Sequence, residues 1–250
     1  MSDLAPDRVA PLLRGSLGTP YLYAEQTGST QNILRDGDHP HGAVAVAEHQ
    51  TAGRGRSGRV WEDEPSRALL CSVLLQPPGG APLPQLSLVV GLAVAAAVEA
   101  TAGAETRLKW PNDVLVDGLK VAGILLEAAG GRVACGIGIN VNQERGELPP
   151  GTRTPAISLR VATGQTLDRG QLLAAVLTEL EARYGRWLAE GLAGLTAELE
   201  ARNALAGRRV VLEAGAGTAG TIASDGRLTV VLDGGHTVLV ESGEIELHAR

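Results

Sequence analysis

The segment from Thr51 to Trp61 restricts the possible folds more than any other part of the chain. It alternates glycine with arginine in a protein whose formal net charge is −6. The residues are Gly53, Arg54, Gly55, Arg56, Gly58 and Arg59. Glycine reaches backbone angles closed to other residues, and arginine is a permanently charged donor suited to carboxylate or phosphate oxygens. Such a segment is poorly suited to an apolar core, so we predict a loop that holds an anion.

The same residues also fit the G-x-G-x-x-G pattern of a dinucleotide-binding turn. That turn must open a helix and lead to an acidic residue at the end of the next strand. The stretch from Arg59 to Ser66 has no helical apolar stripe, and the next apolar run, Ala68 to Leu75, has the pattern of a strand. The sequence therefore disfavours the dinucleotide fingerprint.

Lysine is rare in this chain. Only Lys109 and Lys120 occur among 22 basic residues, and they lie close together in the sequence. A compact ammonium can sit against a carboxylate or phosphate in a narrow pocket, although two solvated lysines are the alternative. Between them Pro111 predicts a turn that presents Asn112 and Asp113 side by side. Placement and chemistry together favour a role in binding anions.

Composition indicates a core of leucine, valine and alanine, because aromatics are 2% of the chain and phenylalanine is absent. The apolar run Leu88 to Val98 is too short to span a bilayer, so we predict a buried helix. Cys71 and Cys135 lie in apolar, strand-like runs, which predicts buried free thiols and a cytoplasmic protein. No N-terminal signal is visible.

The chain predicts an α+β protein with a mixed or antiparallel sheet, packed helices and a boundary near Ala206. We expect residues 1–206 to form the larger domain and residues 207–250 a small β-barrel of short strands separated by glycine turns. The predicted helices are Thr30 to Arg35, Leu86 to Ala102, Asp168 to Leu188 and Leu192 to Asn203. The predicted strands are Ala43 to His49, Ala68 to Leu75, Thr106 to Trp110, Val114 to Val116, Leu119 to Ala128, Arg132 to Val141, Arg208 to Glu213, Thr218 to Ala223, Arg227 to Leu232, Thr237 to Val240 and Glu244 to Leu247.

Five segments between Ser29 and Asn142 resemble those of the biotin–protein ligases and occur in the same order. These are Ser29-Thr30-Gln31-Asn32, Glu48 to Trp61, Lys109-Trp110-Pro111-Asn112-Asp113, Lys120 to Glu127, and Gly136-Ile137-Gly138-Ile139-Asn140-Val141-Asn142. The resemblance implies the biotin/lipoate ligase catalytic fold and an SH3-like C-terminal barrel. It also implies an enzyme that uses ATP and Mg²⁺ to form biotinyl-5′-AMP and transfers biotin to a lysine of a biotin carboxyl carrier protein. Such carrier domains belong to acetyl-CoA or pyruvate carboxylases.

The resemblance also assigns roles to residues. Lys120, Arg54 and Arg56 are the expected catalytic residues. The expected biotin-binding residues are Ser29, Thr30, Gln31, Gln50, Arg54, Gly55, Arg56, Lys120, Gly123 and Gly136. The expected ATP-binding residues are Arg54, Arg56, Trp61, Lys109, Asn112, Asp113, Lys120 and Asn140. No metal ligands are assigned.

Several of these residues have simpler interpretations. Ser29 can be only a helix cap, and Gln50 can be a solvated residue at a strand end. Trp61 can be a core anchor instead of a lid over adenine. Gly136, with Gly138, can mark a bulge or close strand packing, and Asp113 can be a turn residue.

Two other functions remain open. A lipoate ligase would share the fold and the adenylate chemistry, and a biotin-sensing module would share the pocket without catalysis. The Gly-Arg run and Gln50 argue against the first, and retention of both lysines argues against the second. We expect no nucleic-acid partner, because few residues precede Ser29 and the chain is acidic, and no membrane. The oligomeric state, monomer or homodimer, stays open.

The chain departs from the family pattern at two places. The acidic run Glu62-Asp63-Glu64 follows Trp61 where apolar or aromatic residues are expected. His248 stands in the closing motif at a place where arginine can occur.

Overall fold

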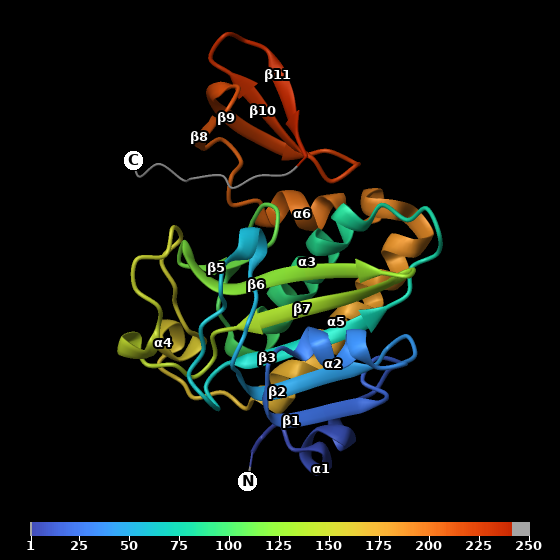
Figure 1. Cartoon of the computed structure of the whole chain (residues 1–250). Coiled ribbons are helices and arrows are strands. Elements are labelled where there is room, and N and C mark those ends of the chain that lie inside the picture. Colours follow the sequence, from blue (N-terminus) through green and yellow to red (C-terminus); the bar gives the residue numbers. More distant parts are fainter. Residues whose placement is uncertain (1, 242–250) are drawn as a thin grey trace.

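The computed structural model describes residues 2–241. A mixed seven-stranded sheet of order β1-β2-β3-β7-β6-β5-β4 carries helices on both faces, and a smaller four-stranded sheet of order β11-β10-β9-β8 follows it (Figure 1). The predicted mixed sheet with packed helices is confirmed. The small sheet lies apart from the large one and does not extend it (Figure 1).

The large sheet contains β1 (Tyr21–Thr27), β2 (Val44–Gln50), β3 (Leu69–Leu75), β4 (Thr106–Lys109), β5 (Asp113–Val116), β6 (Leu119–Ala129) and β7 (Arg132–Ile139). The small sheet contains β8 (Arg209–Leu212), β9 (Gly215–Ile222), β10 (Leu228–Leu232) and β11 (Thr237–Val240). The α-helices are α1 (Pro6–Val9), α2 (Thr30–Asp36), α3 (Leu83–Ala102), α4 (Leu159–Thr163), α5 (Arg169–Glu190) and α6 (Thr196–Arg202). Short 3₁₀ helices are η1 (Ala10–Leu12), η2 (Arg56–Gly58), η3 (Arg145–Glu147) and η4 (Gly191–Leu195).

The mixed character of the sheet comes from its edge. β1 pairs parallel with β2, while β2 pairs antiparallel with β3. A parallel pair needs a crossover, which α2 provides. β1 is missing from the predicted elements because its residues, from Tyr21 to Thr27, are only partly buried and end in polar side chains. Its existence depends on pairing with β2.

The core lies between the large sheet and the helices α3 and α5, with α2 on the opposite face (Figure 1). α3 begins three residues before the predicted start because Pro84 falls in its first turn, where proline is tolerated. Its length and apolar composition would allow it to cross a membrane, but most of it is buried inside the protein. The free thiols of Cys71 and Cys135 are buried as predicted, and burial raises the pKa of Cys71 to about 12.

Helix α5 closes this core and begins as the sequence indicates. The Asp168 carboxylate accepts a hydrogen bond of 2.9 Å from the backbone N–H of Gln171. The apolar residues that recur at helical spacing from Leu172 to Trp187 are buried, whereas Leu188 is exposed. Leu188 directly follows the buried Trp187, so it lies at the edge of the buried face.

Four of the predicted C-terminal strands form the small antiparallel sheet. The strand expected at Glu244 to Leu247, and His248, lie outside the described residues. Among residues 2–241, three side-chain hydrogen bonds join the small sheet and its turns to the larger unit. The Trp110 indole donates to the carbonyl of Gly226, Gln85 to that of Ser224, and Asn203 to that of Gly220. The turn that follows Trp110 is therefore held partly by the small sheet.

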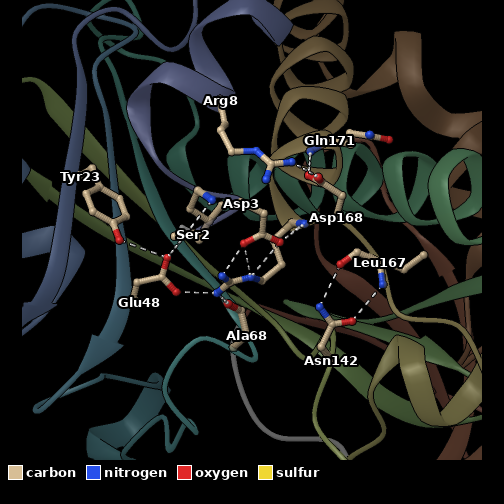
Figure 2. A network of polar contacts seen from close by, with 12 residues as sticks. Ser2, Asp3, Arg8, Tyr23, Glu48, Ala68, Asn142, Leu167, Asp168 and Gln171 are labelled. Carbon is tan, nitrogen blue, oxygen red and sulfur yellow. Dashed lines mark hydrogen bonds and ion pairs between the residues drawn. The ribbon is translucent and has the colours of Figure 1, made fainter.

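A buried arginine joins the base of the Gly-Arg loop to the core. The Arg169 guanidinium, which is 4% exposed, bonds to the carboxylates of Asp3 and Glu48 and to the carbonyl of Ala68. Figure 2 shows these partners together with Ser2 and Tyr23. Since Glu48 precedes the loop and Ala68 follows it, Arg169 holds both ends of the loop against α5.

This network makes stability depend on pH. Burial raises the pKa of Glu48 and of Asp3, but hydrogen bonds from Arg169, and from Ser2 to Glu48, outweigh burial, so both pKa values lie below their ordinary range. A depressed carboxyl pKa contributes stability above the unfolded value of about 4, and that contribution is lost as pH falls further.

We predict that Arg169→Met lowers the free energy of unfolding at pH 7 by roughly 3 kcal/mol, because it leaves buried carboxylates without their partner. The deficit should shrink as pH falls toward 4, where protonation removes the unpaired charge. Urea unfolding of both proteins across this range measures the effect. Arg209→Met, which breaks the exposed pair with Asp233, is the control and should change little. A deficit that does not change with pH would contradict this account.

Candidate functional site

The predicted site residues all lie around one cavity of about 290 Å³. The predicted residues in its wall come from the end of β2, the first turn of α2, the Gly-Arg loop, the turn between β4 and β5, and the strands β6 and β7 with the residue after β7. The predicted residues in the wall are Ser29, Thr30, Gln31, Gln50, Arg54, Gly55, Arg56, Trp61, Lys109, Asn112, Asp113, Lys120, Gly123, Gly136 and Asn140. The fold thus brings together residues that are up to about a hundred positions apart in the sequence.

The Gly-Arg segment is a loop, as predicted, with a narrow hairpin at its tip. Arg54 and Val60 form an antiparallel bridge, and the Gly55 N–H donates to the carbonyl of Arg59 over 2.7 Å. Ser57 at the turn has a positive φ of 57°. At the base, the Ala52 N–H donates to the carbonyl of Gly28. The loop therefore begins beside the first turn of α2.

Two loop arginines bind partners on other elements of the fold. Arg54 forms a bidentate pair with Glu127, with Nε–Oε1 of 2.8 Å and Nη2–Oε2 of 2.9 Å, and its Nη1 donates to Asn32. Arg56 Nη1 donates to the side-chain oxygen of Asn112 over 3.2 Å. These contacts attach the loop to α2, to β6 and to the turn before β5.

Both lysines lie in the cavity wall and have partners. Lys120 Nζ is 2.7 Å from Asp113 Oδ1, and both side chains are largely buried. Lys109 Nζ donates to Thr154 Oγ1 over 2.7 Å. The predicted surface alternative is therefore wrong for Lys120. Asn112 also donates to the carbonyl of Ile124, which fixes the turn against β6.

One end of the cavity is polar but uncharged. Gln50 Oε1 accepts from the backbone N–H of Thr30 over 2.8 Å, so Gln50 caps the N-terminus of α2. Ser29 occupies the N-cap position and is buried, but its side chain makes no capping bond within residues 2–241. Thr30 Oγ1 also bonds to Ser72 Oγ. Gln50 is therefore not a solvated residue at a strand end, and Ser29 does not cap the helix through its side chain. Both simpler interpretations are wrong.

Glycines on β7 make room for two cavity side chains. A Cβ at Gly138 would lie 2.6 Å from the Trp61 ring, and one at Gly136 would lie 3.0 Å from the Gln31 side chain. Gln31 donates to the carbonyls of Leu125 and Ala134. The space beside Gly138 and Gly136 is thus occupied by the side chains of Trp61 and Gln31, which agrees with the close-packing interpretation.

Trp61 lies inside the cavity against the sheet. Its ring centroid is 5.8 Å from Lys120 Nζ, within the range of a cation–π contact. Its Nε1 is buried and has no hydrogen-bond partner among the described residues. The indole therefore has an unused donor beside the central lysine.

The acidic run after Trp61 has a structural role. The side chain of Asp63 is fully buried, with Oδ2 3.0 Å from His49 Nδ1. Burial raises the pKa of Asp63, and the hydrogen bond and charge of His49 only partly oppose it. An apolar residue expected at this place is replaced by a buried polar pair that holds the end of the loop on β2.

Sequence reasoning did not identify the segment that closes the cavity opposite the loop. Pro149, Pro150, Thr152, Arg153, Thr154 and Ala156 line it. The backbone N–H of Lys120 donates to the carbonyl of Pro155, and Asn140 donates to that of Ile157. No motif marks this segment, because it is placed by backbone bonds. Arg59 and Glu62 in the wall, and Asn32 and Glu127 behind it, are also absent from the predicted site.

A preformed metal centre is not evident. Residues 2–241 contain no group of three or more His, Cys, Asp or Glu side chains placed to hold a metal ion. Asp113 and Glu62 are the carboxylates among the described lining residues. Mg²⁺ usually needs only one or two protein carboxylates when it also binds phosphates, so this wall fits an ion that arrives with a nucleotide.

Comparisons with known proteins agree with this geometry. The model of the biotin/lipoate A/B protein ligase family matches residues 23–144. The biotin–[acetyl-CoA-carboxylase] ligase of Mycobacterium tuberculosis is 40% identical over 240 residues, which cover 90% of this chain and 87% of that relative. A solved structure of the biotin protein ligase of Aquifex aeolicus in complex with biotin and ATP has a TM-score of 0.83 and 32% identity, covering 92% of this chain and 98% of that one.

The bifunctional ligase/repressor BirA of Bacillus spizizenii is 38% identical over 186 residues, which cover 70% of this chain. The chain matches only 57% of the length of that relative. The Mycobacterium relative, by contrast, is matched over most of its length. The chain therefore belongs to the biotin protein ligases of the biotin/lipoate A/B protein ligase family.

Proposed function

We propose that this protein is an ATP-dependent biotin–protein ligase that forms biotinyl-5′-AMP and transfers biotin to a lysine of a carrier protein. One observation carries the proposal. Lys120, Arg54 and Arg56 line a single cavity whose wall also contains the uncharged polar residues Ser29, Thr30 and Gln50. This arrangement suits a ligand with a neutral polar head and an anionic tail that must react with phosphate.

The polar end supports binding of the ureido ring of biotin. Thr30, Gln50 and Ser72 form a connected set of hydroxyl and amide groups. A buried ureido group needs both donors and acceptors, because an unpaired polar atom is costly to bury. A dithiolane ring offers neither, so this surface favours biotin over lipoate, as do the names of the relatives described above.

The cationic end supports activation of the biotin carboxylate. A carboxylate oxygen attacks the α-phosphorus of ATP, the bond to the β-phosphate oxygen breaks, and pyrophosphate leaves. Two anions must approach each other, so cations that face the developing charge lower the barrier. Lys120 lies at the centre of the wall and would exchange its contact with Asp113 for the reacting oxygens.

Transfer follows from the same intermediate. An uncharged lysine amine of the carrier attacks the acyl carbon of the mixed anhydride, AMP leaves, and an amide forms with loss of a proton. Until the carrier arrives, the enzyme must keep water away from the anhydride. The Gly-Arg loop, held by Arg54 and Arg56, and the Trp61 indole cover the cavity for this purpose.

Mg²⁺ fits this site as an ion bound with ATP. When bound it would offset charge on the phosphate oxygens. Asp113 is the wall carboxylate that we assign to it, with the oxygen of Asn112 close by in the sequence. Asp113 would become available as Lys120 leaves it.

The remaining assignments complete the proposal. The carrier is the biotin carboxyl carrier domain of an acetyl-CoA or pyruvate carboxylase, the first of which the relatives' names suggest, and the site of action is the cytoplasm. We expect neither a nucleic-acid partner nor a membrane, and either a monomer or a homodimer. We also propose that residues 1–206 and 207–250 are separate domains and that the small sheet belongs to an SH3-like barrel.

Purified protein with Mg²⁺, ATP and biotin should biotinylate one lysine of a carrier domain, and mass spectrometry of the carrier measures this. ATP–pyrophosphate exchange with biotin, and separately with lipoate, distinguishes the alternatives. Exchange with lipoate alone would identify a lipoate ligase. Binding of biotin without exchange would indicate a sensing module.

Lys120→Ala should slow biotin-dependent ATP–pyrophosphate exchange by at least about 100-fold, because a charge used mainly in the transition state is lost. Biotin binding by calorimetry should change much less. Lys120→Met keeps the aliphatic stem and should be as slow as the alanine variant. If methionine restored the exchange rate, the contribution of Lys120 would be packing instead of charge.

Arg56→Gly should still form the adenylate but release it early. The change removes the bond to Asn112 and adds backbone freedom to a loop that already contains three glycines. Bystander proteins should then gain about tenfold more biotin on exposed lysines, compared at matched adenylate-forming rates. Arg14→Gly, at an exposed position outside the cavity wall, is the control. Equal labelling by wild type and Arg56→Gly would exclude a retention role.

A further inference from the structure

We infer that Glu127 is the positioning residue that holds the Gly-Arg loop closed, acting on the reaction only through Arg54. The expected effect on the release of biotinyl-AMP rests on the proposed function, whereas the contact between Glu127 and Arg54 does not depend on it. Glu127 is not among the described residues that line the cavity, whereas Arg54 is. Glu127 therefore contacts the arginine from outside the cavity wall.

The geometry of this pair is specific. Both carboxylate oxygens of Glu127 accept from Arg54, and Asn32 accepts a third N–H of the same guanidinium. Three acceptors from two elements fix the plane of the group, and bidentate pairs are the stronger form of this contact. Arg54 and Glu127 are each about one-third exposed, so water only partly screens the pair.

The position of Glu127 in the fold makes it a rigid anchor. It lies near the end of β6, where it pairs with Ala134 of β7. Asn32 lies in the first turn of α2. The loop is also joined by backbone bonds at its base, but the pair with Glu127 attaches its tip to the sheet. Loss of this pair should therefore free the tip while the base stays in place.

The charge of Glu127 has two opposing effects on the binding of an anionic ligand. It offsets part of the positive charge of Arg54 and so weakens the attraction for an anionic ligand. It also orders the arginine before the ligand binds, which reduces the entropy lost on closure. We infer that ordering dominates, because the carboxylate lies outside the cavity wall, whereas the ligand would bind inside it.

The test measures the release of biotinyl-AMP from wild type, Glu127→Ala and Glu127→Gln. We expect release about five- to tenfold faster for alanine and a smaller increase for glutamine, which keeps one acceptor oxygen. Glu99→Ala is the matched control. Glu99 pairs with Arg202 at similar exposure but is on α3, outside the cavity wall, and its loss should leave the release rate unchanged.

A double-mutant cycle distinguishes positioning from a general structural effect. In an Arg54→Ala background, Glu127→Ala should have no further effect on release, because Glu127 acts only through Arg54. An undiminished effect in that background would overturn the inference. So would wild-type release from Glu127→Ala with an unchanged melting temperature.

Limited trypsin digestion gives a readout that does not depend on activity. Without ligand, Glu127→Ala should be cut faster than wild type after the loop arginines Arg54, Arg56 and Arg59, and Glu99→Ala should not. Equal cutting would show that Glu127 does not hold the loop. If wild type formed no adenylate, the proposed function would fail, while the digestion would still decide the role of Glu127.

Discussion

The site depends on placing several cations around one cavity without unfolding it. Arg54, Arg56, Lys109 and Lys120 line the same wall, and like charges at close range repel. The protein offsets this repulsion with its own side chains. Glu127 pairs with Arg54 and Asp113 with Lys120, while the oxygens of Asn112 and Thr154 accept from Arg56 and Lys109. An anionic ligand can then replace Asp113 beside Lys120, while Glu127 stays paired with Arg54.

The same pairs attach the Gly-Arg loop to rigid elements. Its three glycines give the loop backbone freedom, and side chains from β6 and α2 hold it. Its tip is bound to β6 and α2, and its ends are bound to α5 through Arg169 and to β2 through the Asp63–His49 pair. The glycines that give the loop backbone freedom and the side chains that attach it are therefore at different positions in the loop. A lid of this kind can retain a reactive intermediate and still admit substrate.

The core supports the site through backbone positions more than through side-chain size. Gly136 and Gly138 on β7 leave space for Gln31 and Trp61, and any larger residue at Gly138 would overlap the indole. The small sheet contributes as well, because the carbonyl of Gly226 accepts from Trp110 beside the turn that carries Asn112. The geometry of the cavity is thus sensitive to substitutions at residues that never touch a ligand.

The sequence by itself determined the loop and the order of most elements, because glycine and arginine are constrained locally by backbone freedom and charge. The family resemblance of its motifs indicated the part of the cavity wall that lies between Ser29 and Asn140. Only the tertiary structure decided how those groups are used. β1 forms because β2 pairs with it, and Gln50 at the end of β2 caps the N-terminus of the preceding helix α2. The pairing of Glu127 with Arg54, 73 positions away, has no local signal. Long-range partners depend on how strands are registered and helices packed, and these emerge only when the chain is folded.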